Sequence, residues 1–343
     1  MIKFLLYFSF FILTFILIQF FKTLAPKMRL VDNPDKRKLH SGKIPLVGGI
    51  AIYLSFAISI FFFNYDYLIK SIIFSSIFVV ILGLIDDAFE LGIIVRLASQ
   101  IVATLIVIGT GLSILNFGNY EIIPQFNLGI FSILVTVLAV LALTNAINFV
   151  DGIDGLSSGL VLIALITIFI IFQFEDNNFI PDILYVAIFV ISSFFIINLG
   201  VLPFKRVFLG DSGSMFLGFF LSWLLIYMAS PSNIFFHPVL VIWSISVPIF
   251  DLLGVITRRI LRKSNPFKPD RRHIHHILID LGLPKHIVLI YIIFFALINS
   301  ISGLFFYYYF GPTVCLIMYL FYFLLYFFIS LKLSRKIIYS VTD

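Results

Sequence analysis

Long apolar segments, separated by short polar ones, run through almost the whole chain. A segment of roughly 20 apolar residues is long enough to cross the hydrocarbon core of a bilayer as a helix. Lipid offers no hydrogen-bond partner to an open backbone, so every such segment is predicted to be helical. The pattern predicts an all-α, polytopic integral membrane protein with about eleven transmembrane helices. Their approximate ranges, of which the third is short and should continue past an acidic pair, are 4–21, 47–64, 71–85, 95–113, 129–147, 157–174, 181–199, 214–230, 238–256, 287–308 and 311–330.

The composition agrees with this pattern. Of the 343 residues, 61% are hydrophobic and only 12% are charged, about half the charged share of a soluble domain. A soluble fold, a disordered chain and a disulfide scaffold are therefore excluded, and the single cysteine, Cys315, cannot form an intrachain disulfide. Residues 1–343 are expected to form one transmembrane domain. Its chemistry should lie in five loops on one face: 22–47, 86–96, 148–157, 200–214 and 257–287.

The basic residues give the orientation. With eleven helices, 21 of the 23 Lys and Arg residues fall on one side of the membrane, and only Lys3 and Lys70 fall on the other. The positive-inside rule assigns the basic side to the cytoplasm. The N-terminus is therefore predicted to lie outside and the C-terminus in the cytoplasm. A chain with one span more or fewer would not give so uneven a split, so the asymmetry also supports the count.

Seven acidic residues lie at or near helix ends on the basic side: Asp86, Asp87, Glu90, Asp151, Asp154, Asp211 and Asp251. Carboxylates at that depth are costly, so their default interpretation is functional. Lys, Arg and His surround them in the loops. The arrangement predicts a shallow cytoplasmic cleft in which acids could hold a divalent cation and basic groups could hold phosphates.

Asp86 and Asp87 end the third predicted helix. Adjacent helical residues point about 100° apart, so the two carboxylates are not expected to share one task. One could meet a cation while the other meets a phosphate or a basic residue. The alternative is a helix-end pair anchored in the membrane interface.

The segment 145–155 carries two Asn, two Asp and two Gly without a basic residue. Its glycines permit a tight turn, and Asp151 and Asp154 can share a face if that turn is helical. A turn that only caps the next helix would need fewer polar side chains than this segment has.

Residues 208–214, Phe-Leu-Gly-Asp-Ser-Gly-Ser, begin the eighth predicted helix. A helix N-terminus with Ser and Gly suits anion binding. Asp211 could instead be a simple N-cap, and Phe208 could stack on a base.

The longest predicted cytoplasmic loop contains Arg271-Arg272-His273-Ile274-His275-His276. Three histidines in four residues indicate phosphate recognition or metal binding, with a plain solvated loop as a third option. Phosphate is favoured because cations crowd the same loop. Asp251, seven residues before Arg258, could simply pair with an arginine.

In this order the motifs resemble the polyprenyl-phosphate N-acetylhexosamine-1-phosphate transferase family, also called glycosyltransferase family 4. Residues 145–155, Asn-x-x-Asn-x-x-Asp-Gly-x-Asp-Gly, and residues 208–214 carry most of the resemblance, which runs from about residue 30 to 280. The segments 31–49 and 266–276 resemble the bacterial undecaprenyl-phosphate GlcNAc-1-phosphate transferase branch. The phospho-MurNAc-pentapeptide branch usually has a run of His where this chain has His-Ile-His-His.

The resemblance implies that a lipid phosphate attacks the β-phosphorus of a UDP-N-acetylhexosamine and that UMP leaves. It implies Mg²⁺, with Mn²⁺ as a substitute, held by Asp211 with help from Asp87. Asp86 is expected to deprotonate or position the lipid phosphate, and Asp87 is counted among the catalytic acids as well. Asp151 and Asp154 are expected to be catalytic or structural at the same centre. Substrate-binding roles are implied for His40, Asn148, Phe208, Arg272, His273, His275 and His276.

The implied partners are a UDP-sugar, undecaprenyl phosphate and membrane lipid, with no nucleic acid and with a homodimer as a candidate assembly. The implied location is the bacterial inner membrane, with the active site on the cytoplasmic face, at the first membrane step of O-antigen, common antigen or teichoic acid synthesis. Alternatives are another UDP-acetamido sugar, such as a 6-deoxy sugar, or phospho-MurNAc-pentapeptide. Outside the family, an anion transporter is disfavoured because the acids lie at one face rather than at the midplane. Seven clustered acids beside a basic loop also match an intramembrane aspartyl protease poorly.

Overall fold

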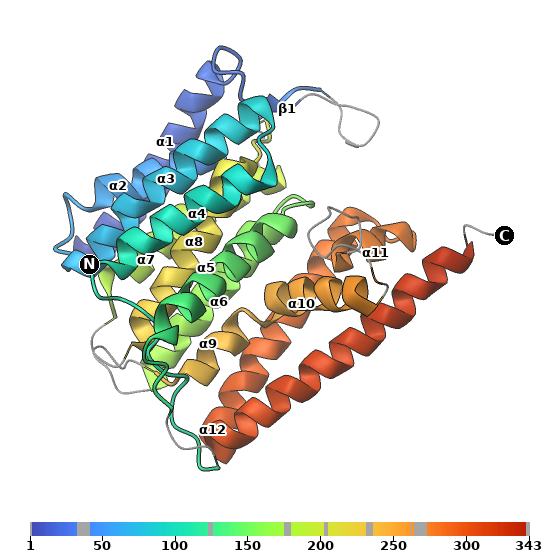
Figure 1. The fold of residues 1–343 in the computed structure, drawn as a ribbon. Coiled ribbons are helices and arrows are strands. Elements are labelled where there is room, and N and C mark those ends of the chain that lie inside the picture. The colour runs from blue at the N-terminus through green and yellow to red at the C-terminus, as the bar shows by residue number, and fades with distance from the viewer. Residues whose placement is uncertain are drawn as a thin grey trace.

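The computed structural model describes residues 2–32, 42–122, 126–174, 180–201, 205–230, 236–261, 263 and 273–340, with side chains up to 334. These residues are mostly helical (Figure 1), as the sequence predicts. A two-residue antiparallel pair, β1 (Val31–Asp32) with β2 (Ile44–Pro45), precedes α2. The helices are α1 (Ile2–Leu24), α2 (Gly48–Ser59), α3 (Tyr67–Phe89), α4 (Ile93–Ile108), α5 (Phe131–Phe149), α6 (Leu156–Phe174), α7 (Asp182–Leu199), α8 (Gly210–Ala229), α9 (Pro238–Ser244), α10 (Ser246–Leu261), α11 (Ile274–Asp280) and α12 (Lys285–Ser340).

Among the described residues, seven helices are long and apolar enough to cross a membrane, or eight if the bent pair α9 and α10 counts as one. The bend between α9 and α10 is 77°. Two further apolar helices, α2 and α4, are shorter, and α12 is interrupted at Gly311 (φ 81°), directly before Pro312. Each of the eleven predicted segments overlaps a helix. The protein is therefore a multi-pass membrane protein.

Helix α8 lies at the centre of the packing and is buried along most of its length. Small residues let its neighbours approach its backbone closely, as is common between membrane helices. A Cβ added at Gly83 of α3 would lie 2.3 Å from the Cα of Ser212, and one at Gly49 of α2 would lie 2.3 Å from the backbone N of Gly213. A Cβ at Gly218 would lie 2.6 Å from the Cα of Thr144 of α5. Three helices are thus held against α8 at the level of the acidic residues.

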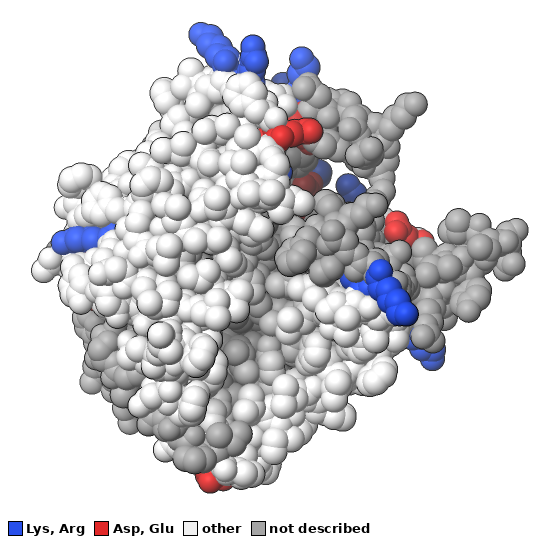
Figure 2. Space-filling view, viewed as in Figure 1, with Lys and Arg blue, Asp and Glu red and all other residues white. Residues whose placement is uncertain are grey.

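Polar groups collect at the two ends of the bundle, and apolar side chains cover its flank. Exposed apolar residues include Phe4 of α1, Ile94 of α4 and Phe328 of α12. In Figure 2 most of the charged side chains gather at the top and right of the view, several of them around a hollow, while the lower flank is almost uncharged. This distribution fits a bundle surrounded by lipid.

Helix α12 is a hairpin of two long arms that meet at Gly311 (Figure 1). Its arms contact each other, since the hydroxyls of Ser302 and Tyr322 lie 3.3 Å apart. The hairpin packs on α6, α9, α10 and α11. It therefore supports the short helix α11, which begins within the predicted histidine segment.

Candidate active site

Asp86, in the last turn of α3, is buried and occupied by two donors. Its Oδ2 forms an ion pair with Arg96, whose Nε lies 2.6 Å away, and its Oδ1 accepts a hydrogen bond from the backbone N–H of Leu91. A second guanidinium nitrogen of Arg96 lies 3.5 Å from Oδ2 of Asp211. Arg96 therefore bridges the carboxylates that α3 and α8 contribute.

Asp87 caps the N-terminus of α8 from outside that helix. Its Oδ1 accepts from the backbone N–H of Asp211 at 2.7 Å, and its Oδ2 accepts from that of Ser212 at 3.2 Å. The first N–H groups of a helix have no partner within it and carry partial positive charge, so a carboxylate there is favourable. Gly210, at φ +76°, permits the approach, because a Cβ on it would lie 2.6 Å from Oδ2 of Asp87. The adjacent acids thus have different tasks, as the 100° spacing predicts.

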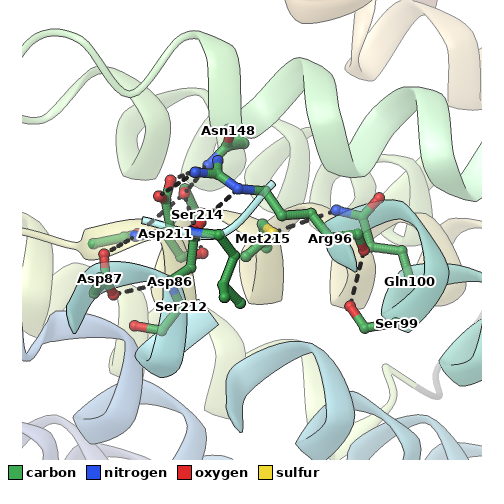
Figure 3. A network of polar contacts seen from close by, with 12 residues as sticks. Asp86, Asp87, Arg96, Ser99, Gln100, Asn148, Asp211, Ser212, Ser214 and Met215 are labelled. Atoms are coloured by element: carbon green, nitrogen blue, oxygen red, sulfur yellow. Dashed lines mark hydrogen bonds and ion pairs between the residues drawn. The ribbon is translucent and has the colours of Figure 1, made fainter. Parts of the chain in front are cut away.

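Asp211 lies where the helices converge (Figure 3). Asn148, near the end of α5, donates from Nδ2 to Oδ1 of Asp211 and to Oγ of Ser214, both at 2.8 Å. About a third of the Asp211 side chain, 32%, remains exposed. Asp211 is therefore held in place and still accessible to a ligand.

The turn between α5 and α6 brings Asp151 and Asp154 to the same end of the bundle. Burial, together with the nearby carboxylates of Asp211, Asp87 and Asp154, raises the pKa of the Asp151 carboxyl well above its usual range. Asp154 lies further out and pairs with Arg206 at 3.1 Å. Burial first, and the nearby carboxylates second, thus disfavour the charge on Asp151.

Buried Asn198, at the end of α7, ties this turn to the segment before α8. Its Oδ1 accepts from the backbone N–H of Gly155 at 2.6 Å, and its Nδ2 donates to the carbonyl of Val207 at 2.9 Å. The sequence pattern gives no signal for Asn198, and it distinguishes Arg96 from the other basic loop residues in no way. An isolated polar residue inside or beside an apolar run is the one signal that could have found them.

The histidine segment packs directly against the acidic turn. His275 is fully buried, and a Cβ on Gly152 would lie 2.4 Å from its Nε2. The rings of His275 and His276 are 4.1 Å apart between centroids, and the ring of His273 lies 5.3 Å from that of Phe149. The structure thus brings together two motifs that are more than a hundred residues apart in the chain.

Asp251 does not take the arginine partner considered from the sequence. Its Oδ2 lies 2.7 Å from Nδ1 of His273, and its Oδ1 accepts from the backbone N–H of Ile274 at 2.9 Å. Arg258 instead donates to Oγ of Ser330 at 2.6 Å. Asp251 therefore anchors the start of α11.

Phe208 joins two segments of the site through its backbone. Its N–H donates to the carbonyl of Pro45 at 2.9 Å, and its carbonyl accepts from the N–H of Gly48 at 3.0 Å. Stacking of its ring on a base stays a prediction. Two other predicted substrate ligands, His40 and Arg272, lie outside the described residues.

The donor set fits a magnesium ion that the protein holds only in part. Among the described residues, no three His, Cys, Asp or Glu side chains surround a common metal position. Mg²⁺ typically takes one or two carboxylates and completes its shell with substrate phosphates and water. Asp211 is accessible, and besides burial the carboxylates of Asp211, Asp87 and Asp154 raise the pKa of Asp151, so a dication here would offset nearby negative charge. Both oxygens of Asp87 meet backbone N–H groups, so Asp87 is the less available of the two predicted ligands.

Comparison with known proteins defines the class. Residues 69–229 match the model of glycosyl transferase family 4. The curated undecaprenyl-phosphate alpha-N-acetylglucosaminyl 1-phosphate transferase of Pasteurella multocida (strain Pm70) is 34% identical, over 84% of this chain and 82% of that protein. The proteins of the same name from Escherichia coli (strain K12) and Haemophilus influenzae (strain ATCC 51907 / DSM 11121 / KW20 / Rd) are each 33% identical, over 91% and 82% of this chain and 86% and 81% of their own lengths. The chain is thus a membrane-bound phosphoglycosyl transferase. It belongs to glycosyl transferase family 4, which confirms the resemblance that its motifs indicate.

Proposed function

We propose that this protein transfers N-acetylglucosamine 1-phosphate from UDP-N-acetylglucosamine to undecaprenyl phosphate and releases UMP. The observation that carries the proposal is the convergence of Asp86, Asp211 and Asn148 from α3, α8 and α5 beside the Asp151 turn. The names of the relatives supply the lipid acceptor and the sugar. Phosphoryl transfer depends on alignment and charge neutralisation, which such a cluster provides.

In the proposed reaction an oxygen of the lipid phosphate attacks the β-phosphorus of the donor. A new P–O bond forms, and the bond to the bridging oxygen of UMP breaks. Asp211, held by Asn148, would hold Mg²⁺, which supplies charge neutralisation for the diphosphate when it is bound. Asp86 would position or deprotonate the lipid phosphate, and Arg96, which bridges Asp86 and Asp211, lies where it could exchange a carboxylate for a phosphate oxygen. Asp87 would keep the N-terminus of α8 directed at this point.

The proposed topology has eleven spans, with the N-terminus outside, the C-terminus in the cytoplasm and the site at the cytoplasmic face of the bacterial inner membrane. The uneven split of 21 against two basic residues supports it. It requires α2, α4 and each arm of α12 to cross the bilayer. The exposed apolar residues Phe62, just after α2, Ile94 of α4 and Phe328 of α12 are consistent with lipid contact. The product would enter an envelope polysaccharide pathway such as O-antigen, common antigen or teichoic acid synthesis.

The decisive assay uses purified protein, undecaprenyl phosphate, Mg²⁺ and a panel of radiolabelled UDP-sugars. The expected result is a labelled lipid product from UDP-N-acetylglucosamine. Because one phosphoanhydride replaces another, excess UMP should convert that product back to UDP-sugar. A product from a different UDP-acetamido sugar alone would replace the proposed donor. Active transfer without UMP-dependent reversal would contradict the chemistry.

A further inference from the structure

Asp251 of α10 is a buried carboxylate that receives hydrogen bonds from three separate places. Nδ1 of His273 lies 2.7 Å from Oδ2, and the backbone N–H of Ile274 donates to Oδ1 at 2.9 Å. The third donor is the hydroxyl of Tyr326, also 2.9 Å from Oδ1. Only 1% of Asp251 is exposed, so these donors stand in for water. Each of them matters, because a buried charge that loses a donor is costly to keep.

Tyr326 reaches Asp251 from the second arm of α12, 75 residues away in the chain. Four residues further along that arm, Ser330 accepts from the buried guanidinium of Arg258, also on α10. Residues four apart share one face of a helix, so both polar contacts lie on the face of the arm that meets α10. The aromatic rings around Tyr326 are Phe250 and Phe295. The second arm thus meets α10 through two polar contacts within an apolar interface.

The contact has a consequence for the histidine segment. With its Nδ1 directed at Asp251, His273 has its ring orientation fixed and keeps Nε2 as the nitrogen that can meet a substrate. His275, two residues on, packs on Gly152 of the acidic turn. A change at Asp251 therefore reaches the predicted phosphate ligands and the turn beside them.

We infer that Tyr326 is a positioning residue for the transfer reaction. Its hydroxyl, in hydrogen bond to Asp251, holds His273 in the orientation that receives a phosphate of the substrate. The inference rests on the proposed function in taking His273 as a phosphate ligand. A merely structural role for Tyr326 makes a different prediction, because its removal would then act on stability and would not depend on whether His273 is present.

The activity test is a double-mutant cycle with Tyr326→Phe and His273→Gln. Alone, Tyr326→Phe should lower kcat/KM roughly tenfold to a hundredfold, the usual cost of a hydrogen bond to a charged group. In the His273→Gln background it should lower kcat/KM less than about twofold, because residues that act as one unit are not additive. Full additivity, or an unchanged kcat/KM for Tyr326→Phe alone, would overturn the inference.

Tyr322→Phe is the matched control. Tyr322 lies one turn earlier on the same arm, but its hydroxyl meets Ser302 of the first arm rather than α10. Tyr322→Phe removes the same hydroxyl oxygen from the same helix as Tyr326→Phe, but without touching the contact to Asp251. Its effect on kcat/KM should therefore be small and additive with that of His273→Gln. An equal loss in Tyr322→Phe would mean that the arm tolerates no such change, which contradicts a specific role for Tyr326.

A spectroscopic test needs no substrate. In protein with isotope-labelled histidine, the ring signals of His273 are identified by their loss in His273→Gln. The wild type should show Nδ1 protonated and hydrogen-bonded, and Tyr326→Phe should shift that signal while Tyr322→Phe leaves it in place. Inactivity of the wild type in the transfer assay would refute the proposed function. The spectroscopic measurement would still show whether Tyr326 holds His273 through Asp251. An unshifted His273 signal in Tyr326→Phe would refute the positioning role.

Discussion

At the scale of single residues, the carboxylates of the site differ in the groups that they contact and in how much of each side chain stays exposed. Asp86 is buried under Arg96, whereas Asp211 keeps 32% of its side chain exposed while Asn148 fixes one oxygen. Burial, together with the neighbouring carboxylates, raises the pKa of Asp151. Acids of the same type thus differ in what they can still bind, and Asp211 is the one best placed for a cation.

Asp211→Asn tests that difference. The change removes the charge with little change in size, so activity should fall by about two to three orders of magnitude, since a metal contributes several kcal/mol to such a reaction. The level of protein in the membrane and its melting temperature in detergent should stay close to wild type. A variant that retains most of its activity would show that Asp211 only begins helix α8.

Gly152→Ala tests the packing of the histidine segment on the acidic turn. The new Cβ would lie 2.4 Å from Nε2 of His275, so that ring must move. Transfer activity should fall roughly tenfold or more, because displacements of about 1 Å at reacting groups cost up to a hundredfold. Gly92→Ala is the control, since nothing lies within 4 Å of its added Cβ and its φ is −70°. Equal activities of the two variants would separate His275 from the reaction.

At the scale of elements, the site depends on the contact between the end of α3 and the beginning of α8. Asp87 binds two backbone N–H groups of α8, and Gly210 and Gly83 allow the close approach. Because Asp211 is the second residue of α8, its position follows from this contact. Two helices, rather than one loop, therefore hold the Asp211 carboxylate in place.

Asp87→Asn should reveal this capping in the stability of the protein. An amide can accept only through its oxygen, so one N–H of α8 loses its partner, at a cost of about 1–3 kcal/mol. The melting temperature in detergent should fall together with activity, whereas Asp211→Asn should lower activity alone. Loss of activity at an unchanged melting temperature would instead favour Asp87 as a metal ligand.

The sequence predicted the apolar helices, because the length of an apolar segment is a local property, while the side of the membrane on which the acids lie stays a prediction. It also singled out the acids, Asn148 and the histidines of the site, but not Arg96 or Asn198. It did not predict the break between α9 and α10 or the external cap that Asp87 gives α8. Nor could it pair Asp251 with Tyr326, because contacts between helices 75 residues apart leave no periodic signal in one sequence.

At the scale of the whole molecule, the fold separates two polar ends by an apolar flank. The acidic cluster lies at one end, and pairs such as Tyr227 with Asp66 and Tyr7 with Asp182 lie away from it. Most of the described candidate-site residues belong to ends of helices or to the turns that join them, rather than to a separate domain. One end of the bundle therefore carries the candidate site.

Reporter fusions at the C-terminus test which face that is. The 21-to-two split of basic residues predicts a cytoplasmic C-terminus. An alkaline phosphatase fusion should be inactive there, and a fluorescent protein fusion should be bright. An active phosphatase and a dark fluorescent protein would mean that the C-terminus lies outside. The proposed number of spans would then be wrong by one.

The contact between Asp87 and α8 can form only after a delay while the chain is being synthesised. Its partners are 124 residues apart, and a ribosome adds about 5–20 residues per second, so about 6 to 25 seconds pass before α8 follows α3. During that interval the carboxylate of Asp87 has no helix end to cap and must remain hydrated at the membrane surface. Tyr326 is made later still. The candidate site and the contact that supports it are therefore complete only near the end of translation, after most of the helices have been made.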